Sequence, residues 1–209
     1  MKTISRTLRV LAATALAATV LLSQAVASPV VSISPVTQTI GVGGFATIDI
    51  IVSGLTDPTG GFSLTLNYNN TILSGDSYTN DPDGKMGALP VDLSGGFIGG
   101  GTLHLDLFFV ADPTETEASL AASEGAGFRL ATVTFKGLVD GLSPLTLSDV
   151  VLSNWDGTAT LAGIGSLNGE VCVNSAGGPC AAAPEPGTML LVGSALSALA
   201  IIRRRKQAA

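Results

Sequence analysis

The chain has 209 residues, of which 46% are hydrophobic, 5% aromatic and only 12% charged, with 26 glycines and 10 prolines. The charged fraction is about half of that in an average soluble protein, which argues against a coiled coil, a basic nucleic-acid-binding protein and an ordinary charged cytosolic enzyme. The apolar content is too high for an intrinsically disordered chain, so an all-β or a membrane-associated protein remains.

The first 27 residues have the three parts of a secretory signal peptide. Lys2, Arg6 and Arg9 precede an apolar run over residues 10–22, and Ala25-Val26-Ala27 supplies a small-residue cleavage site. The alternative is a helix of the folded domain, which would not need this order of features. We therefore expect cleavage after Ala27 and export of the rest of the chain.

Seven runs between residues 30 and 173 have the composition of short β-strands. We expect strands over residues 30–33, 46–53, 61–68, 102–110, 129–138, 145–152 and 166–173. Alternation is clearest in the run 102–110, where Leu103, Leu105 and Leu107 share one face and His104 and Asp106 share the other. Because Gly-rich and Asp-rich turns separate these runs, the pattern predicts one all-β sandwich over residues 28–180.

One segment of this domain has the signature of a helix. Asp112 as the N-cap, Pro113 at the first position and the acidic Glu115 and Glu117 in the first turn favour a short helix that ends before Gly125. We expect it to be a connector between strands.

Cys172 and Cys180 are the only cysteines, and a flexible Ala-Gly-Gly-Pro run lies between them. A disulfide in an exported chain would contribute about 2 to 3 kcal/mol and pin the last strand beside the segment that follows. Two free thiols or a partial metal site are the alternatives, although two ligands with no nearby His cannot build a zinc site. The disulfide is the favoured interpretation.

Residues 181–209 combine an uncharged stretch with a basic end. The 17 residues 186–202 carry no charge, and Arg203, Arg204, Arg205 and Lys206 follow them. As a helix the stretch would measure about 26 Å, a marginal match to a hydrocarbon core of about 30 Å. We expect a single transmembrane helix whose basic cluster stays cytoplasmic, the orientation that the N-terminal signal also requires.

The part between the two ends is strongly acidic. Residues 28–184 hold 15 acidic residues against three basic ones, a net charge of −12. Such a domain is repelled by nucleic acid and by anionic lipid, and it attracts cations or basic surfaces.

The order of Pro184-Glu185-Pro186, a short apolar stretch and a basic end resembles the PEP-CTERM sorting signal of Gram-negative bacteria. The resemblance implies an exosortase-type protease-transferase that cleaves near this motif and passes the protein from an inner-membrane intermediate to the cell surface or extracellular matrix. The two prolines keep Glu185 in an extended, accessible backbone. A simple C-terminal anchor with an accidental Pro-Glu-Pro is the alternative.

The succession of motifs between residues 30 and 173 resembles that of cohesin-like modules, whose sandwich is shared with some cellulose-binding modules. The matching runs are Val31-Ser32-Ile33, Gly41-x-Gly43, residues 45–50, residues 61–69 with Leu73, residues 128–137 and residues 145–157. Where family members commonly show Tyr-Asp, this chain has Tyr68-Asn69. The resemblance implies a single jelly-roll sandwich, and we expect its partner to be a dockerin-like peptide, an extracellular polysaccharide or a neighbouring copy.

Candidate catalytic residues are few. His104 and Asp106 project from one face of a predicted strand, where a nearby Ser would complete a triad. The favoured interpretation is a solvent-facing polar row on an amphipathic strand.

Paired acids occur at Asp81 with Asp83 and at Glu115 with Glu117, but neither pair lies in an aromatic cleft of the kind that glycosidases use. We expect solvated turn and cap residues. Asp81 and Asp83 are also candidate ligands for a loop calcium ion, although the spacing lacks the EF-hand succession and its closing Glu. A turn is favoured, and no metal or other cofactor is expected.

Sugar binding needs exposed flat aromatic side chains, and Trp155, in a turn-like Asn-Trp-Asp-Gly run, is the best candidate for a ligand contact. Its alternative role is packing against the end of the sandwich.

Together the features of the sequence predict an exported, non-catalytic protein with a protein- or polysaccharide-binding module and no nucleic-acid partner. The alternative is a secreted carbohydrate-active enzyme or its carbohydrate-binding accessory module.

Overall fold

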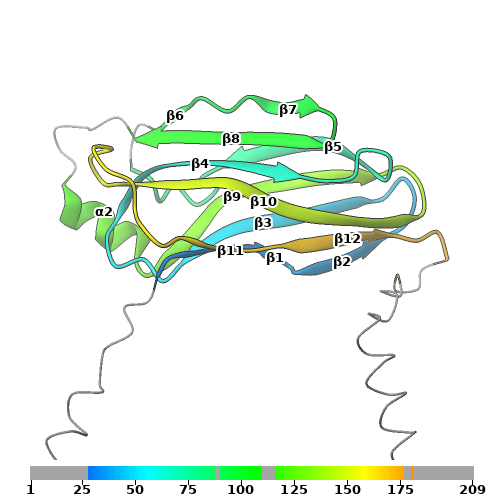
Figure 1. The fold of residues 1–209 in the computed structure, drawn as a ribbon, viewed down its shortest axis with the longest axis horizontal. Coiled ribbons are helices and arrows are strands. Elements are labelled where there is room, and N and C mark those ends of the chain that lie inside the picture. Colours follow the sequence, from blue (N-terminus) through cyan, green and yellow to red (C-terminus); the bar gives the residue numbers. More distant parts are fainter. Residues whose placement is uncertain (1–27, 88–89, 110–115, 177–179, 181–209) are drawn as a thin grey trace, which may run out of the picture.

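The computed structural model describes residues 28–87, 90–109, 116–176 and 180. Two β-sheets stack face to face around one apolar core, and the short helix α2 lies at one end (Figure 1). The strands are β1 (Val30–Ser34), β2 (Thr37–Ile40), β3 (Phe45–Ser53), β4 (Thr59–Asn67), β5 (Leu73–Asn80), β6 (Pro90–Asp92), β7 (Gly96–Gly99), β8 (Thr102–Phe109), β9 (Gly127–Gly137), β10 (Gly141–Asn154), β11 (Gly165–Leu167) and β12 (Gly169–Val173), and α2 is Glu117–Glu124. The predicted all-β sandwich is confirmed.

Successive long strands alternate between the two sheets. The first sheet has the order β11-β1-β3-β9-β5, and the second has the order β2-β12-β10-β4-β8-β6, with β7 also paired to β8. The β1–β11 and β2–β12 pairs are parallel, and the long central pairs are antiparallel. Because consecutive strands lie in opposite layers, their inward side chains meet across the core.

The core follows the period-two pattern of the strands. Leu103, Leu105 and Leu107 of β8 are buried, as their alternation predicts, and they belong to one continuous cluster with the inward residues of both sheets. The Phe97 ring packs against Gly75, where a Cβ atom would lie 2.2 Å from the ring, so any other residue at this strand position would have to displace the ring.

Four strands escaped prediction from the sequence, namely β2, β5, β6 and β7. They are short or polar, and β5 contains a bulge at Asp76, so none shows clear alternation.

The predicted strand 166–173 is wrong as one element. Asn168 divides it into β11 and β12, which join different sheets, and its side-chain oxygen accepts the Leu147 N–H at 3.0 Å.

The predicted helix exists but starts later than expected. Its N-cap is Thr116, whose hydroxyl accepts the Ser119 N–H while the Ser119 hydroxyl accepts the Thr116 N–H, so this capping box corrects the assignment of the cap to Asp112. Asp112, Pro113 and Glu115 lie outside the described residues. Gly125 is the C-cap, as predicted.

The predicted disulfide is present between Cys172 and Cys180, with their Cα atoms 5.6 Å apart. Within the described ranges, no helix is long and apolar enough to cross a membrane. The predicted signal peptide (1–27), the Pro184-Glu185-Pro186 motif, the stretch 186–202 and the basic residues Arg203 to Lys206 lie outside those ranges.

Candidate functional site

The outer faces of the two sheets differ in character. On the first sheet, Thr132 donates a hydrogen bond from its hydroxyl to Asp49 at 2.6 Å, and the hydroxyls of Thr47 and Thr134 lie 3.3 Å apart. This face is a layer of mutually bonded polar side chains. The second sheet instead carries a pocket, which makes it the better candidate for binding.

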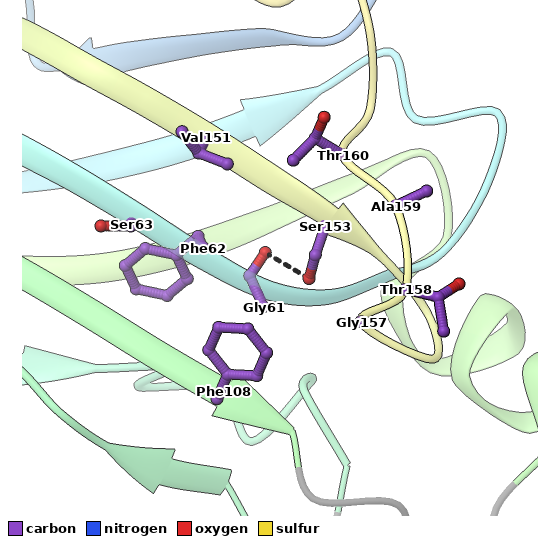
Figure 2. A pocket seen from close by; sticks show the side chains of 10 residues that line it. All are labelled: Gly61, Phe62, Ser63, Phe108, Val151, Ser153, Gly157, Thr158, Ala159 and Thr160. Carbon is purple, nitrogen blue, oxygen red and sulfur yellow. Dashed lines mark hydrogen bonds between the residues drawn. The ribbon is translucent and has the colours of Figure 1, made fainter.

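The pocket has a volume of about 530 Å³ and lies where β4, β8 and β10 run side by side (Figure 2). Its lining residues are Gly61, Phe62 and Ser63 of β4, Phe108 of β8, Val151 and Ser153 of β10, and Gly157, Thr158, Ala159 and Thr160 of the loop that follows β10. The register aligns Gly61 with Phe108 and Ser153, and Ser63 with Val151. Phe108 and Val151 are each 40% exposed, so they form apolar walls on either side of a floor made by Gly61 and Ser63.

The end wall is the tightly bonded loop 155–160. The Asn154 N–H donates to the Ala159 carbonyl at 2.8 Å, and the Asn154 side-chain oxygen accepts the Ala159 N–H at 2.9 Å. The hydroxyl and N–H of Thr158 both donate to Asp156, which lowers the pKa of that carboxyl and keeps it ionised. These hydrogen bonds connect both ends of the loop and its centre.

Next to the pocket, a glycine of β4 allows two backbones to approach closely. At Gly60 a Cβ atom would lie 2.4 Å from the Trp155 carbonyl oxygen, so the loop after β10 can approach β4 only at a glycine. The next carbonyl, that of Gly61, accepts a hydrogen bond from the Thr59 hydroxyl at 3.0 Å. It also accepts one from the Ser153 hydroxyl at 3.3 Å (Figure 2). These bonds fix the floor relative to β10.

None of the described residues that line this pocket has an ionisable side chain. Its apolar walls and hydroxyl groups suit an apolar side chain or a weakly polar group, whereas acid–base chemistry needs a titratable group at the reacting atoms.

His104 and Asp106 lie beside the pocket, on the outer face of β8. Their register partners on β4 are Thr65 and Ser63. In the described part of the chain no hydrogen bond joins His104, Asp106 and Ser63 into a triad, and Asp106 Oδ1 is buried without a partner there. Both side chains are half-buried, so the expected row faces outward but is not fully solvated.

Asp81 and Asp83 serve different structural purposes. The buried Asp81 carboxylate accepts the N–H groups of Lys85 at 2.7 Å and Met86 at 2.9 Å, which closes the turn after β5 and corrects the expectation of a solvated residue. Asp83 forms an ion pair with Arg129 that lowers the pKa of the Asp83 carboxyl. No group of three or more potential metal-ligating His, Cys, Asp or Glu residues occurs among the described residues, and the calcium interpretation stays a prediction.

Trp155 starts the loop that closes the pocket and is half-buried, but its side chain is not part of the lining. Its role as a ligand contact stays a prediction.

The residues that line the pocket were not predicted from the sequence, because they come from three separate strands and a loop. One feature of the sequence could have indicated the pocket. Phe108 lies on the same outward face of β8 as His104 and Asp106, where an exposed aromatic residue is unusual.

The comparisons with known proteins fit both parts of the chain. Residues 182–206 match the family model of the PEP-CTERM protein-sorting motif. A search of curated proteins found no match.

Among solved structures, the sandwich is similar to a type II cohesin domain from the cellulosome of Acetivibrio cellulolyticus, with 18% identity and a TM-score of 0.55 over 69% of this chain and 95% of that one. It is also similar to the seventh ScaB type I cohesin of Pseudobacteroides cellulosolvens, with 20% identity and a TM-score of 0.54 over 73% and 96% of the two chains. A third match is the sixth cohesin of A. cellulolyticus scaffoldin B, in complex with a Cel5 dockerin mutant, with 15% identity and a TM-score of 0.51 over 70% and 99%. The chain therefore has a cohesin-like β-sandwich fold and a PEP-CTERM sorting motif, and that motif indicates a secreted protein of the exosortase-sorted kind.

Proposed function

We propose that this protein is a non-catalytic binding module of the cell surface or extracellular matrix, and that its pocket holds an apolar side chain of a dockerin-like protein partner. The observation that carries the proposal is the pocket itself, an uncharged hollow between Phe108 and Val151 on the outer face of a sheet. Its volume accommodates one or two large side chains, and buried apolar anchors supply most of the affinity of protein interfaces.

The surroundings of the pocket suggest the chemistry of the partner. Asp149 is exposed at the bulge of β10 beside Val151, Asp156 lies in the loop, and Asp106 is the register partner of Ser63. Acidic groups around an apolar centre favour a partner that places Lys or Arg side chains around its apolar anchor. The strongly acidic charge of residues 28–184 would accelerate association with such a partner.

A polysaccharide ligand has less support. Sugar rings stack on exposed flat aromatic rings, and the exposed aromatic ring at the pocket is that of Phe108 alone among the described residues. An enzymatic role would need titratable groups at the pocket, and the described residues of its lining provide none.

The binding test compares two matched Ser→Phe variants. Ser63→Phe places a ring on the pocket floor, whereas Ser77→Phe adds the same bulk to the exposed face of β5 on the other sheet. Purified dockerin domains and soluble polysaccharides are the probes. We expect Ser63→Phe to weaken dockerin binding at least about tenfold and Ser77→Phe to leave it unchanged. Equal binding by both variants, or binding to polysaccharide alone, would contradict the proposal.

We further propose that sorting passes through an inner-membrane intermediate of a Gram-negative cell, with residues 186–202 as a temporary span and Pro184-Glu185-Pro186 as the processing site. A span of 17 residues is a poor permanent anchor but is adequate for one step of sorting. Glu185→Ala leaves the span and the basic cluster intact, so the variant should accumulate in the inner membrane with its tail. Intact-mass measurement of wild-type protein extracted from the cell surface tests the processing step. A protein that still ends at Ala209 would rule out processing.

A further inference from the structure

The end of the sandwich opposite α2 carries a group of exposed apolar side chains. Val42, Phe45, Leu138 and Val139 are between 45% and 55% exposed. They are close together because the Gly43 N–H donates to the Gly137 carbonyl at 2.8 Å, and the Gly137 N–H donates to the Gly44 carbonyl at 2.9 Å. We call these four residues the apolar end.

The tail leaves the domain from this same end. The disulfide ties Cys180 to β12, and Cys180 Sγ lies 3.6 Å from the carbonyl oxygen of Gly141, two residues beyond Val139. Asp140 adds a second fixed point, because it accepts the Ser175 N–H at 2.7 Å. The point at which the chain leaves toward residue 181 is therefore held against the apolar end (Figure 1).

The distance from this point to the uncharged stretch is short. Residues 181–185 separate Cys180 from Pro186, and a fully extended chain of that length spans at most about 20 Å. While residues 186–202 are inserted, the apolar end is thus confined to within about 20 Å of the lipid surface. Trp155 follows the last residue of β10, at the far end of the strand that starts at Gly141.

The distribution of charge favours the same orientation. Among the loops at the apolar end, residues 41–44, 69–72, 99–101 and 138–141, Asp140 is the one acidic residue, and the exposed Lys136 is paired with Phe45. The opposite end carries Asp57, Asp81, Asp83, Glu117, Glu124 and Asp156. Apart from Asp140, these loops therefore hold no acidic group that an anionic membrane would repel, whereas the opposite end is rich in acidic groups.

We propose that the apolar end contacts the lipid surface while the tail is still inserted in the membrane. The opposite end of the domain, which carries the pocket, then points away from the membrane. The inference rests on the proposed sorting step, because it needs an inserted tail. Side chains such as Phe and Val gain stability from insertion at the boundary of headgroups and acyl chains, and the tail removes most of the entropic cost of bringing them there. The contact also holds residues 184–186 near the membrane surface, where a membrane protease can reach them.

The test uses the full chain, purified with its tail from cells that lack the processing enzyme and reconstituted into phosphatidylcholine vesicles with or without brominated acyl chains. Trp155 is the single tryptophan, so the wild-type protein reports on the far end. Phe45→Trp in a Trp155→Phe background reports on the apolar end. We expect brominated lipid to quench the emission of the Phe45→Trp protein about twofold or more, and to leave that of Trp155 nearly unchanged.

Two further variants in the reporter background test the cause of the contact. Val42→Ser with Val139→Ser should at least halve the quenching, whereas Leu93→Ser, which removes an exposed apolar side chain from the loop after β6, should not change it. Cys172→Ser with Cys180→Ser should lower the quenching by freeing the point of exit, with circular dichroism confirming the fold.

The outcomes separate this inference from the proposed function. Protein that floats with the vesicles but shows no quenching of the Phe45→Trp reporter overturns the contact and leaves the anchoring intact. Protein that does not float overturns the anchoring and the contact together. Quenching that persists in the Val42→Ser, Val139→Ser protein also overturns the assignment of the contact to the apolar end.

Discussion

The carboxylate of Glu124, in the last turn of α2, accepts the backbone N–H of Thr59 at 2.8 Å and so ties the helix to the first residue of β4. Glu124 is only 3% exposed, and its second oxygen has no hydrogen-bond partner among the described residues. Burial is the main cause that raises the pKa of Glu124 to about 8; the Thr59 N–H opposes this shift, and the nearby Asp81 carboxylate adds to it. The helix is therefore held by an acid that is protonated at neutral pH.

This relationship predicts a specific pH dependence of stability. The ordinary pKa of 4.5 applies to the unfolded chain, so between pH 4.5 and about 8 the unfolded state loses this proton while the folded state keeps it. The free energy of unfolding should then fall as pH rises through that window. Glu124→Gln keeps an acceptor for Thr59 and cannot ionise, so it should match the wild type at pH 4 and exceed it by about 2 to 4 kcal/mol at pH 9. Urea titrations at both pH values measure this, and identical pH profiles would contradict the buried-acid account.

The close approach at Gly60 predicts a severe effect of one methyl group. Gly60→Ala forces a Cβ atom against the Trp155 carbonyl oxygen, so it should cost more than about 3 kcal/mol or prevent folding. Gly41→Ala is the matched control, since a Cβ atom there meets nothing within 4 Å. Thermal unfolding of both variants checks the pair. A Gly60→Ala protein as stable as the control would show that the loop after β10 can move away from β4.

The disulfide stabilises the fold without creating it. It closes a short ring after β12, with a sequence separation of 8, and the core consists of residues from both sheets. Cys172→Ser with Cys180→Ser should lower the free energy of unfolding by about 2 to 3 kcal/mol and keep a single transition. Loss of cooperative unfolding in guanidinium titrations would instead make the bridge essential for the fold.

The outward-facing residues His104 and Asp106 of β8 are predicted to be dispensable for folding. His104→Ala with Asp106→Ala should change the free energy of unfolding by less than about 1 kcal/mol, because removing the unpartnered Asp106 oxygen offsets the lost packing. Thr59→Val is the contrasting variant, since the buried Thr59 hydroxyl bonds to the Gly61 and Ser153 carbonyls, and we expect a loss of about 1 to 3 kcal/mol. A screen for glycosidase and esterase turnover accompanies the measurement. Turnover that disappears in the double variant would overturn the non-enzymatic interpretation.

Several elements followed from local patterns because the relevant physics acts over a few residues. The Leu103, Leu105 and Leu107 alternation identified a buried strand, and the end of the helix followed from Gly125. The N-cap was misplaced at Asp112 because the Thr116–Ser119 box competes for the same helix start. Strand β5 was missed because its partner β9 stabilises a polar segment that has little tendency to form a strand alone.

The sorting motif at residues 182–206, the all-β class and the cysteine pair could be predicted without a structure, since each depends on composition or on residues that are neighbours along the chain. The pocket and the apolar end, by contrast, arise from contacts between distant parts of the chain. Gly61, Phe108 and Val151 meet because strand register aligns three strands that are distant in sequence, and Val42 lies near Leu138 because two backbone hydrogen bonds join their turns. The pKa of Glu124 likewise depends on burial between α2 and β4, which no local pattern of residues encodes.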